Sequence, residues 1–297
     1  MRILADYIMR GRTQAIIVAS TLALLSLKFP PISILSSATI ALVTLRRGAV
    51  EGLYILFGAG IAAALLGYFA IDNFQFALLY AMLLWLPVWA ISIILREGRQ
   101  LSLAVEIAVF IGMLGVAGFY LFIDNPAALW TALLEQMMQQ AAPLQDIKNW
   151  IGEFSHYMTG MFAAGTVFSL LFGLFLGRWW QSQLFNPGGF KQEFLLLNTS
   201  PKLAISSLIV LAVAFFATET VAEVAWNMTI LLFVLYTVIG TSVLHVVFSQ
   251  TPISRFAVPL FYVTLFLVPQ VLPPVAVVGL IDAWLNLRKR NSNQTSA

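Results

Sequence analysis

The chain has 297 residues, of which 60% are hydrophobic and only 10% are charged, and its formal net charge is +3. This composition excludes an ordinary soluble domain. The chain contains no cysteine, which excludes disulfides, thiolate catalysis and cysteine-bound metals. Because backbone polar groups inside lipid must pair within their own segment, the long runs that are apolar on every face predict an all-α, polytopic transmembrane helical bundle.

Ten apolar runs are separated by charges or by clusters of Pro and Gly. They are 13–29, 31–45, 49–71, 74–95, 101–123, 157–177, 203–219, 225–248, 256–270 and 273–287. A bilayer core of about 30 Å requires about 20 helical residues. The runs 31–45, 256–270 and 273–287 are short, which favours half-helices or re-entrant hairpins there. We therefore expect 8–10 hydrophobic segments in a single transmembrane domain, 1–297.

The connection at 124–155 is predicted to be an amphipathic helical hairpin. Asn125-Pro126 is typical of a helix start, and an apolar stripe follows it at helical spacing. A second stripe begins after a break at 141–143. We expect this hairpin on the extracytoplasmic side, either as a structural cap in the outer interface or as a lid over an outward-facing cavity.

Basic residues are sorted by side, which predicts the orientation. If the N-terminus is cytoplasmic and the segments alternate, all 16 Lys and Arg residues except Lys28 and Lys148 fall inside. The basic start resembles a signal peptide but lacks a small-residue cleavage site, so we expect a retained first helix. The sequence predicts a multi-pass protein of the bacterial cytoplasmic (inner) membrane with both termini in the cytoplasm.

Two further regions are expected on the cytoplasmic side. The loop 178–202 contains Asn186-Pro187-Gly188-Gly189, which predicts a tight turn because it lacks the spacing of a phosphate-binding loop. The end of the chain, 288–297, is a basic and polar tail. The partners implied are the lipid bilayer, other membrane subunits and a small-molecule ligand, with no nucleic acid.

Ionisable side chains inside apolar segments are costly and are therefore candidates for substrate binding. Glu106 is the most interior carboxylate and could bind a cation, relay a proton or bond an amine, or else pair with a nearby arginine. His245 could titrate or bond a substrate, or act as a neutral imidazole that bonds a neighbouring helix. Asp282 could bind substrate or form a salt bridge with Arg288.

Small residues recur at four-residue spacing on the first helix, at Ala15, Ala19 and Ala23. Such spacing lets helices approach closely, either within the chain or at a partner subunit that docks there. Gly173 and Gly177 repeat the pattern on a later segment. No zinc motif, rhomboid-like serine loop or pair of intramembrane aspartates is present, so we expect no catalytic residue, no metal site and no cofactor, and the chain is not expected to be an enzyme.

Three local motifs resemble the YybS-like bacterial membrane proteins, a family of unknown function. They are the 186–190 turn with Glu193-Phe194, the run 279–284 followed by Arg288-Lys289, and the first hairpin ending in Arg46-Arg47-Gly48. The resemblance implies a more distant similarity to the S components of energy-coupling-factor transporters. Those proteins bind micronutrients and dock through an alanine face that Ala15, Ala19 and Ala23 are similar to.

These features favour a small-solute transport protein or a substrate-capture subunit of a larger permease. One alternative is a non-transporting scaffold or regulatory protein that acts through the 178–202 loop and the basic tail. A weaker alternative is an intramembrane enzyme that acts on lipid. Essential residues at Glu106, His245 or the outer hairpin would favour transport, whereas essential residues in 178–202 would favour scaffolding.

Overall fold

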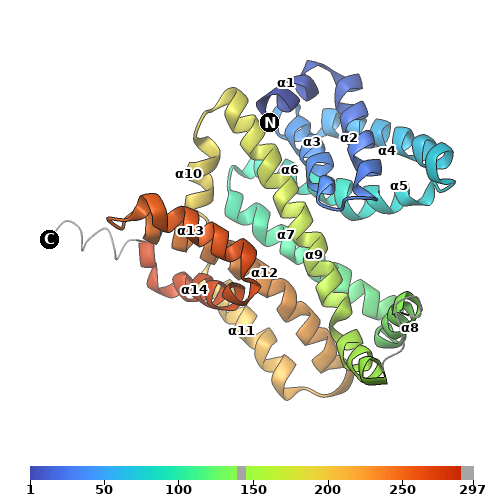
Figure 1. The fold of residues 1–297 in the computed structure, drawn as a ribbon. Helices are drawn as coiled ribbons and strands as arrows, with labels where there is room; N and C mark the ends of the chain where they lie inside the picture. Colours follow the sequence, from blue (N-terminus) through green and yellow to red (C-terminus); the bar gives the residue numbers. More distant parts are fainter. Residues whose placement is uncertain (139–144, 289–297) are drawn as a thin grey trace. The chain divides into compact units, whose positions relative to one another are not determined.

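The structure, a computed structural model, describes residues 1–138 and 145–288 (Figure 1). Within these residues every regular element is a helix and no strand occurs. The predicted all-α fold is confirmed. The chain forms two compact units, which are described separately: unit 1 comprises Met1–Ala108 and Thr166–Leu197, and unit 2 comprises Val109–Gly165 and Asn198–Ala297.

Unit 1 is built around α3 (Ile32–Arg47), whose residues from Ser36 to Leu45 are all buried. It also contains the start of α7 (Leu101–Phe122) and the second half of α9 (Gln145–Phe185). The other elements are α1 (Arg2–Arg10), α2 (Arg12–Ser26), α4 (Ala49–Ile71), α5 (Gln75–Tyr80), the π-helix η1 (Ala81–Trp85), α6 (Leu86–Gly98) and α10 (Gly189–Leu195).

Small residues bring α9 against α3 in unit 1. A Cβ added at Gly173 would lie 2.7 Å from the Cβ of Ser37, and one added at Gly177 would lie 2.6 Å from the Cβ of Ala41. Real Cβ atoms do not approach so closely, so these positions require glycine. The predicted role of this glycine pair in close helix packing is confirmed.

Pro87 is accommodated without ending its segment. A proline inside a helix removes one hydrogen bond and crowds the preceding turn. Here the single π-turn Ala81–Trp85 precedes it, and Pro87 lies in the first turn of α6. The stretch Gln75–Gly98 therefore continues as one 24-residue apolar segment.

Unit 2 is built around α12 (Glu219–Ser249), which packs on α11 (Pro201–Phe216), α13 (Ser254–Leu267) and α14 (Leu272–Leu285). It also contains α8 (Pro126–Met138) and the first part of α9. The backbones of α12 and α14 touch at two glycines. A Cβ at Gly240 would lie 1.9 Å from the carbonyl oxygen of Val275, and one at Gly279 would lie 2.1 Å from that of Tyr236.

Prolines bend the C-terminal pair of helices. The short 3-10 helix η2 (Pro269–Val271) separates α13 from α14, and the two helices meet at 109°. Pro273 and Pro274 occupy the first turn of α14, where their missing N–H groups cost nothing. The pair is thus either one broken span or a re-entrant loop, as the short runs 256–270 and 273–287 predicted.

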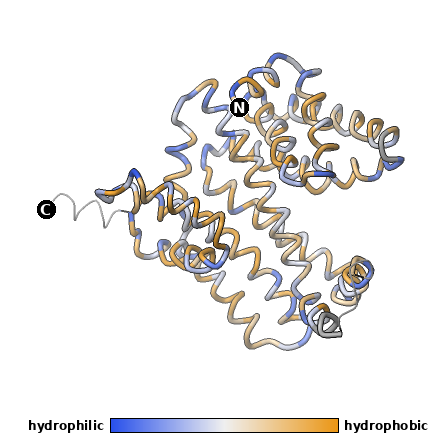
Figure 2. The backbone as a smooth tube through the Cα atoms, viewed as in Figure 1, coloured by the Kyte–Doolittle hydropathy of each residue, from blue (hydrophilic) through white to orange (hydrophobic). Residues whose placement is uncertain are grey.

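Fewer of the described helices could cross a membrane than the 8–10 segments expected from sequence. Five described helices are long and apolar enough to cross a membrane, or six if the bent pair forms one span. The helices α2 and α11 are apolar but have only 15 and 16 residues. Hydrophobic residues make up much of the length of most helices (Figure 2), which is compatible with a multi-pass membrane protein.

Both predicted connections, 124–155 and 178–202, contain helices among the described residues. The hairpin expected at 124–155 contains α8 and the start of α9, while its break at 141–143 lies outside the described residues. Its second arm is not a separate helix, because α9 continues from Gln145 to Phe185. In 178–202, the turn at Asn186–Gly189 forms as predicted, with Gly188 at φ +86°. Of the tail 288–297, only Arg288 is described.

Candidate functional site

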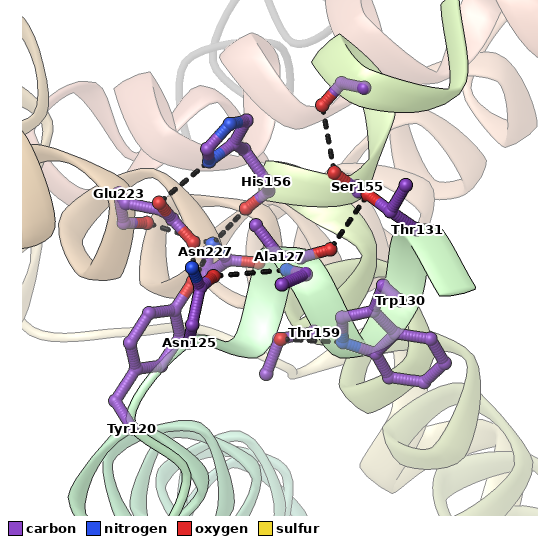
Figure 3. A network of polar contacts seen from close by, with 12 residues as sticks. Tyr120, Asn125, Ala127, Trp130, Thr131, Ser155, His156, Thr159, Glu223 and Asn227 are labelled. Carbon is purple, nitrogen blue, oxygen red and sulfur yellow. Dashed lines mark hydrogen bonds and ion pairs between the residues drawn. The ribbon is translucent and has the colours of Figure 1, made fainter. Parts of the chain in front are cut away.

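Four polar side chains from three helices of unit 2 meet in one cluster (Figure 3). Tyr120 lies in the last turn of α7, His156 lies on α9, and Glu223 and Asn227 lie one turn apart on α12. We call these four residues the polar cluster. Each of the three helices is otherwise rich in apolar residues, so the side chains depend on one another for hydrogen bonds.

Glu223 is the acceptor at the centre of the polar cluster. The Tyr120 hydroxyl donates to its Oε1 (2.6 Å), and Nδ1 of His156 lies 2.7 Å from its Oε2. The Glu223 side chain is 19% exposed, whereas the His156 side chain is 53% exposed. A carboxylate is thus held in a fixed position between a phenol and a half-exposed imidazole.

Asn227 joins α12 to the backbone of α9. Its Oδ1 accepts from the N–H of Gly160, and its Nδ2 donates to the carbonyl oxygen of His156 (2.7 Å). In a regular helix these two backbone groups, four residues apart, bond to each other. The carboxamide of Asn227 therefore bonds both the N–H of Gly160 and the carbonyl oxygen of His156, one turn earlier in α9. Asn227 is fully buried, so this pairing satisfies a side chain that has no access to water.

The amide nitrogen of Asn227 also bonds two other members of the polar cluster, Tyr120 and Glu223. The Tyr120 hydroxyl lies 3.1 Å from Nδ2, and the carbonyl oxygen of Glu223 lies 2.8 Å from it. Two amide hydrogens are shared among the neighbouring oxygens. Asn227 thereby fixes the position of Tyr120 and of the α9 backbone at His156, the two groups that hold Glu223.

Gly160 makes the contact between α9 and α12 possible. A Cβ at this position would lie 2.7 Å from both the Cα and the carbonyl oxygen of Asn227. Any larger residue would push the Asn227 backbone away from α9. The glycine is therefore part of the geometry that brings His156 to Glu223.

An aromatic group flanks the cluster on α8 and α9. Nε1 of Trp130 donates to Oγ1 of Thr159 (2.9 Å), and the indole packs on the rings of Phe119 and Phe162. Asn125 accepts from the N–H of Ala128 and so begins α8 next to the end of α7. These contacts attach α8 to the same end of unit 2 as the polar cluster (Figure 3).

No family model, curated protein or solved structure matches this chain. The resemblance to the YybS-like proteins, and through it to the S components of energy-coupling-factor transporters, stays a prediction. The function must therefore be argued from the geometry of the chain itself.

The sequence-predicted residues Glu106, His245 and Asp282 lie outside the polar cluster. Glu106 is half-buried on α7 in unit 1. His245 is on α12, where its Nδ1 lies 2.9 Å from the hydroxyl of Tyr262 and the two rings pack edge to face. This contact agrees with the alternative in which His245 bonds a neighbouring helix, and its role in substrate binding stays a prediction.

Asp282 makes the local contacts expected of a helix-end anchor. Its Oδ1 accepts from the N–H of Leu287 (2.8 Å), and its Oδ2 lies 3.4 Å from Nη2 of Arg288. Burial lowers the pKa of Arg288, and the Asp282 carboxylate opposes that shift. The salt bridge that the sequence left as an alternative is thus present, and substrate binding by Asp282 stays a prediction.

The alanines proposed as a docking face are covered by helices of unit 1. Ala15, Ala19 and Ala23 are at most 1% exposed, and α2 packs on α3 and α4. Their small side chains serve close packing inside the unit. Docking of a partner subunit on this face stays a prediction.

Metal ligands are not grouped in the part of the chain that the structure describes. No set of three His, Asp or Glu side chains there could hold a metal ion. The polar cluster has one carboxylate and one imidazole, which is too few for a closed structural zinc site. Its chemistry suits reversible hydrogen bonding and charge pairing.

Sequence reasoning missed most of the cluster. Glu219 and Glu223 are four residues apart, so the sequence alone places them on one helix face, as a weak cation site or as a solvated rim. In the structure Glu219 is exposed at the start of α12, whereas Glu223 bonds Tyr120 and His156. One signal was available: Asn227 stands in an otherwise apolar segment, and a buried amide there requires a partner on another helix.

Proposed function

We propose that this chain is a membrane transport or substrate-capture protein that binds a small, positively charged solute at the polar cluster. The observation that supports this proposal is the Glu223 carboxylate, which is mostly buried and is held by Tyr120 and by the half-exposed His156. A buried charge that is oriented but still accessible is characteristic of a binding site in a membrane protein.

The solute would take the place of His156 on the Glu223 carboxylate. An ammonium group can donate to the oxygen that His156 now approaches, while the Tyr120 bond to the other oxygen remains. The imidazole and a cationic solute would then compete for the same carboxylate.

The proposed location is the bacterial cytoplasmic membrane, with both termini inside and the polar cluster near the outer surface. The sorting of Lys and Arg supports this orientation. The 22 residues of α7 extend about 33 Å at 1.5 Å per residue, close to the thickness of a bilayer core. Arg99 precedes the first turn of α7 and Tyr120 lies in its last turn, so these two residues stand at opposite ends of this one helix.

Ligand-induced stabilisation of the purified chain tests the proposal. The panel would contain putrescine and lysine, with butanediol and glutamate as uncharged and anionic controls. A ligand present at 100 times its Kd stabilises a protein by about 2.7 kcal/mol, so a binding amine should raise Tm measurably. Glu223→Gln should abolish this rise, whereas Glu219→Gln, an exposed site on the same helix, should preserve it.

Uptake into proteoliposomes would then separate capture from transport. If no cation stabilises the protein, or if Glu223→Gln responds like the unmodified chain, binding at the polar cluster is wrong. Co-purification of another membrane protein that depends on 178–202 would in that case favour the scaffold alternative.

A further inference from the structure

Helix α1 presents an unusual surface at one end of unit 1. It has three strips, because residues three or four apart share a helix face. Ala5 and Ile8 are buried against the unit. Arg2, Asp6 and Arg10 form an exposed charged strip. Beside it, Ile3 is 85% exposed and Tyr7 is also exposed, with the Arg10 guanidinium 5.8 Å from the centre of its ring, so this side of α1 is an exposed apolar flank.

The position of α1 is fixed by contacts with the neighbouring helices. Nη2 of Arg47, at the end of α3, donates to the carbonyl oxygen of Met9, which satisfies one of the last carbonyl groups of α1. Gly11, in extended conformation, is the only residue between α1 and α2. Since α2 is an apolar helix, α1 lies within a few ångströms of the level at which the apolar part of unit 1 begins.

This level is also rich in arginine. Arg12, the first residue of α2, pairs with Glu51 near the start of α4. Nη1 of Arg96 donates to the carbonyl oxygen of Leu45 (2.6 Å), and the Arg46 guanidinium lies over the ring of Phe185. These contacts link the ends of several helices. In Figure 2, hydrophilic residues occur along the backbone near α1.

We propose that α1 is an in-plane anchor that binds the anionic headgroups of the bilayer. Its apolar flank would enter the boundary between headgroups and acyl chains, while Arg2 and Arg10 pair with lipid phosphates. An amphipathic helix with arginines beside an exposed apolar flank is suited to this interface. The proposal does not depend on the function proposed for the polar cluster, which lies in unit 2.

Charge complementarity favours lipid over a protein as the occupant. Exposed arginines lie on α1 and at the ends of α2, α3 and α6, and guanidinium groups match phosphate oxygens. Those arginines are Arg2, Arg10, Arg12, Arg46, Arg47 and Arg96. Two apolar stretches of unit 1, Ala49–Phe69 and Gln75–Gly98, are long enough to cross a bilayer, and the bilayer surface would then lie near their ends.

Site-directed spin labelling of the full chain can test the anchor, because the chain has no native cysteine. A label at Ile3→Cys would be compared in nanodiscs of phosphatidylcholine and of equal parts phosphatidylcholine and phosphatidylglycerol. Phe57→Cys, 62% exposed in the apolar stretch of α4, serves as the immersed control. Gln100→Cys, exposed between α6 and α7, serves as the water-facing control.

In the anionic nanodiscs, we expect the Ile3 label to be shielded from a water-soluble nickel relaxant and open to oxygen, as the Phe57 label is. In phosphatidylcholine alone, the shielding should decrease because the anionic headgroups are absent. In about 1 M salt it should decrease because the surface charge is screened. Arg10→Gln should reduce the immersed population about fivefold.

Two results would overturn the proposal. A label at Ile3 that stays as accessible to nickel as the label at Gln100 in both lipids would show that the flank does not enter the bilayer, and would point to a protein partner. Equal shielding in the two lipids would show that anionic headgroups are not what α1 binds.

Discussion

The substitution Gly160→Ala tests how the polar cluster is assembled. The added Cβ would lie 2.7 Å from two atoms of Asn227, its Cα and carbonyl oxygen, and 2.8 Å from its Oδ1. Overpacking of this kind costs about 1–3 kcal/mol. Replacing a helical glycine by alanine gains about 0.5–1 kcal/mol through helix propensity. We therefore expect a net loss of about 1–2 kcal/mol, since backbone atoms cannot move aside as a flexible side chain can.

Gly165→Ala is the matched control on the same helix. Nothing lies within 4 Å of a Cβ built at Gly165, so this variant gains the helix propensity without the packing cost. The difference between the two variants then isolates the packing cost, because the propensity gain is common to both. SDS titration of each variant in dodecylmaltoside micelles, followed by tryptophan fluorescence, would measure the two free energies of unfolding.

A double substitution makes the same prediction sharper. Two of the three close contacts involve main-chain atoms of Asn227 that alanine also has. Adding Asn227→Ala to Gly160→Ala should therefore fail to restore stability. Full restoration, or unfolding midpoints that are the same for Gly160→Ala and Gly165→Ala, would refute the close backbone contact between α9 and α12.

Three other substitutions probe separate contacts. Asn227→Ala alone should cost only about 0.6–1.7 kcal/mol in SDS titration, because the Gly160 N–H and the His156 carbonyl can bond each other once the amide is gone; a cost above 3 kcal/mol would contradict this. Gly279→Ala should cost more than about 3 kcal/mol, since its Cβ would meet the Tyr236 carbonyl oxygen at 2.1 Å; its monodisperse yield should collapse while that of Gly118→Ala is unchanged. Arg178→Gln removes the paired hydrogen bonds to Glu193 and should speed hydrogen exchange in α10 about tenfold. Lys191→Gln removes a charge without removing these bonds, so equal exchange rates in the two variants would assign the effect to lost charge alone.

The positions of the helices could be predicted from the sequence because local signals mark their ends. The run 49–71 coincides with α4, and the residues that flank it explain why. Gly48 has φ +106° and Asp72 is left-handed, so neither continues a helix. Prolines likewise lie in the first turns of α11 and α14.

The number of crossings depends on tertiary structure that the apolar pattern does not contain. The pattern treats 256–270 and 273–287 as two runs, and only the folded chain shows that they form a pair bent by 109°. The apolar pattern also ends the sixth run at 177, where the charged Arg178 follows, but α9 continues to Phe185. The helix can include Arg178 because the guanidinium pairs with Glu193 on α10.

The polar cluster could not be predicted because its members are far apart in the chain. His156 and Glu223 are separated by 67 positions, and Tyr120 and Asn227 by 107. Taken alone, each of the charged residues resembles a solvated helix end. What joins them is the close approach at Gly160, and the sequence shows that glycine without showing the helix it faces.

Polar contacts to backbone carbonyl groups differ from those between side chains in whether a ligand could replace one partner. In unit 1, Leu45 gives its carbonyl oxygen to both Arg96 and Gln181, and Met9 gives its own to Arg47. These bonds satisfy helix ends that would otherwise lack partners, so exchanging them would expose a backbone group. In the polar cluster the exchangeable partner is a side chain: if His156 turns away, Glu223 keeps Tyr120, and Asn227 keeps its bonds to α9. A cation would therefore replace the imidazole without disturbing the helix packing, which is why we propose ligand binding at Glu223.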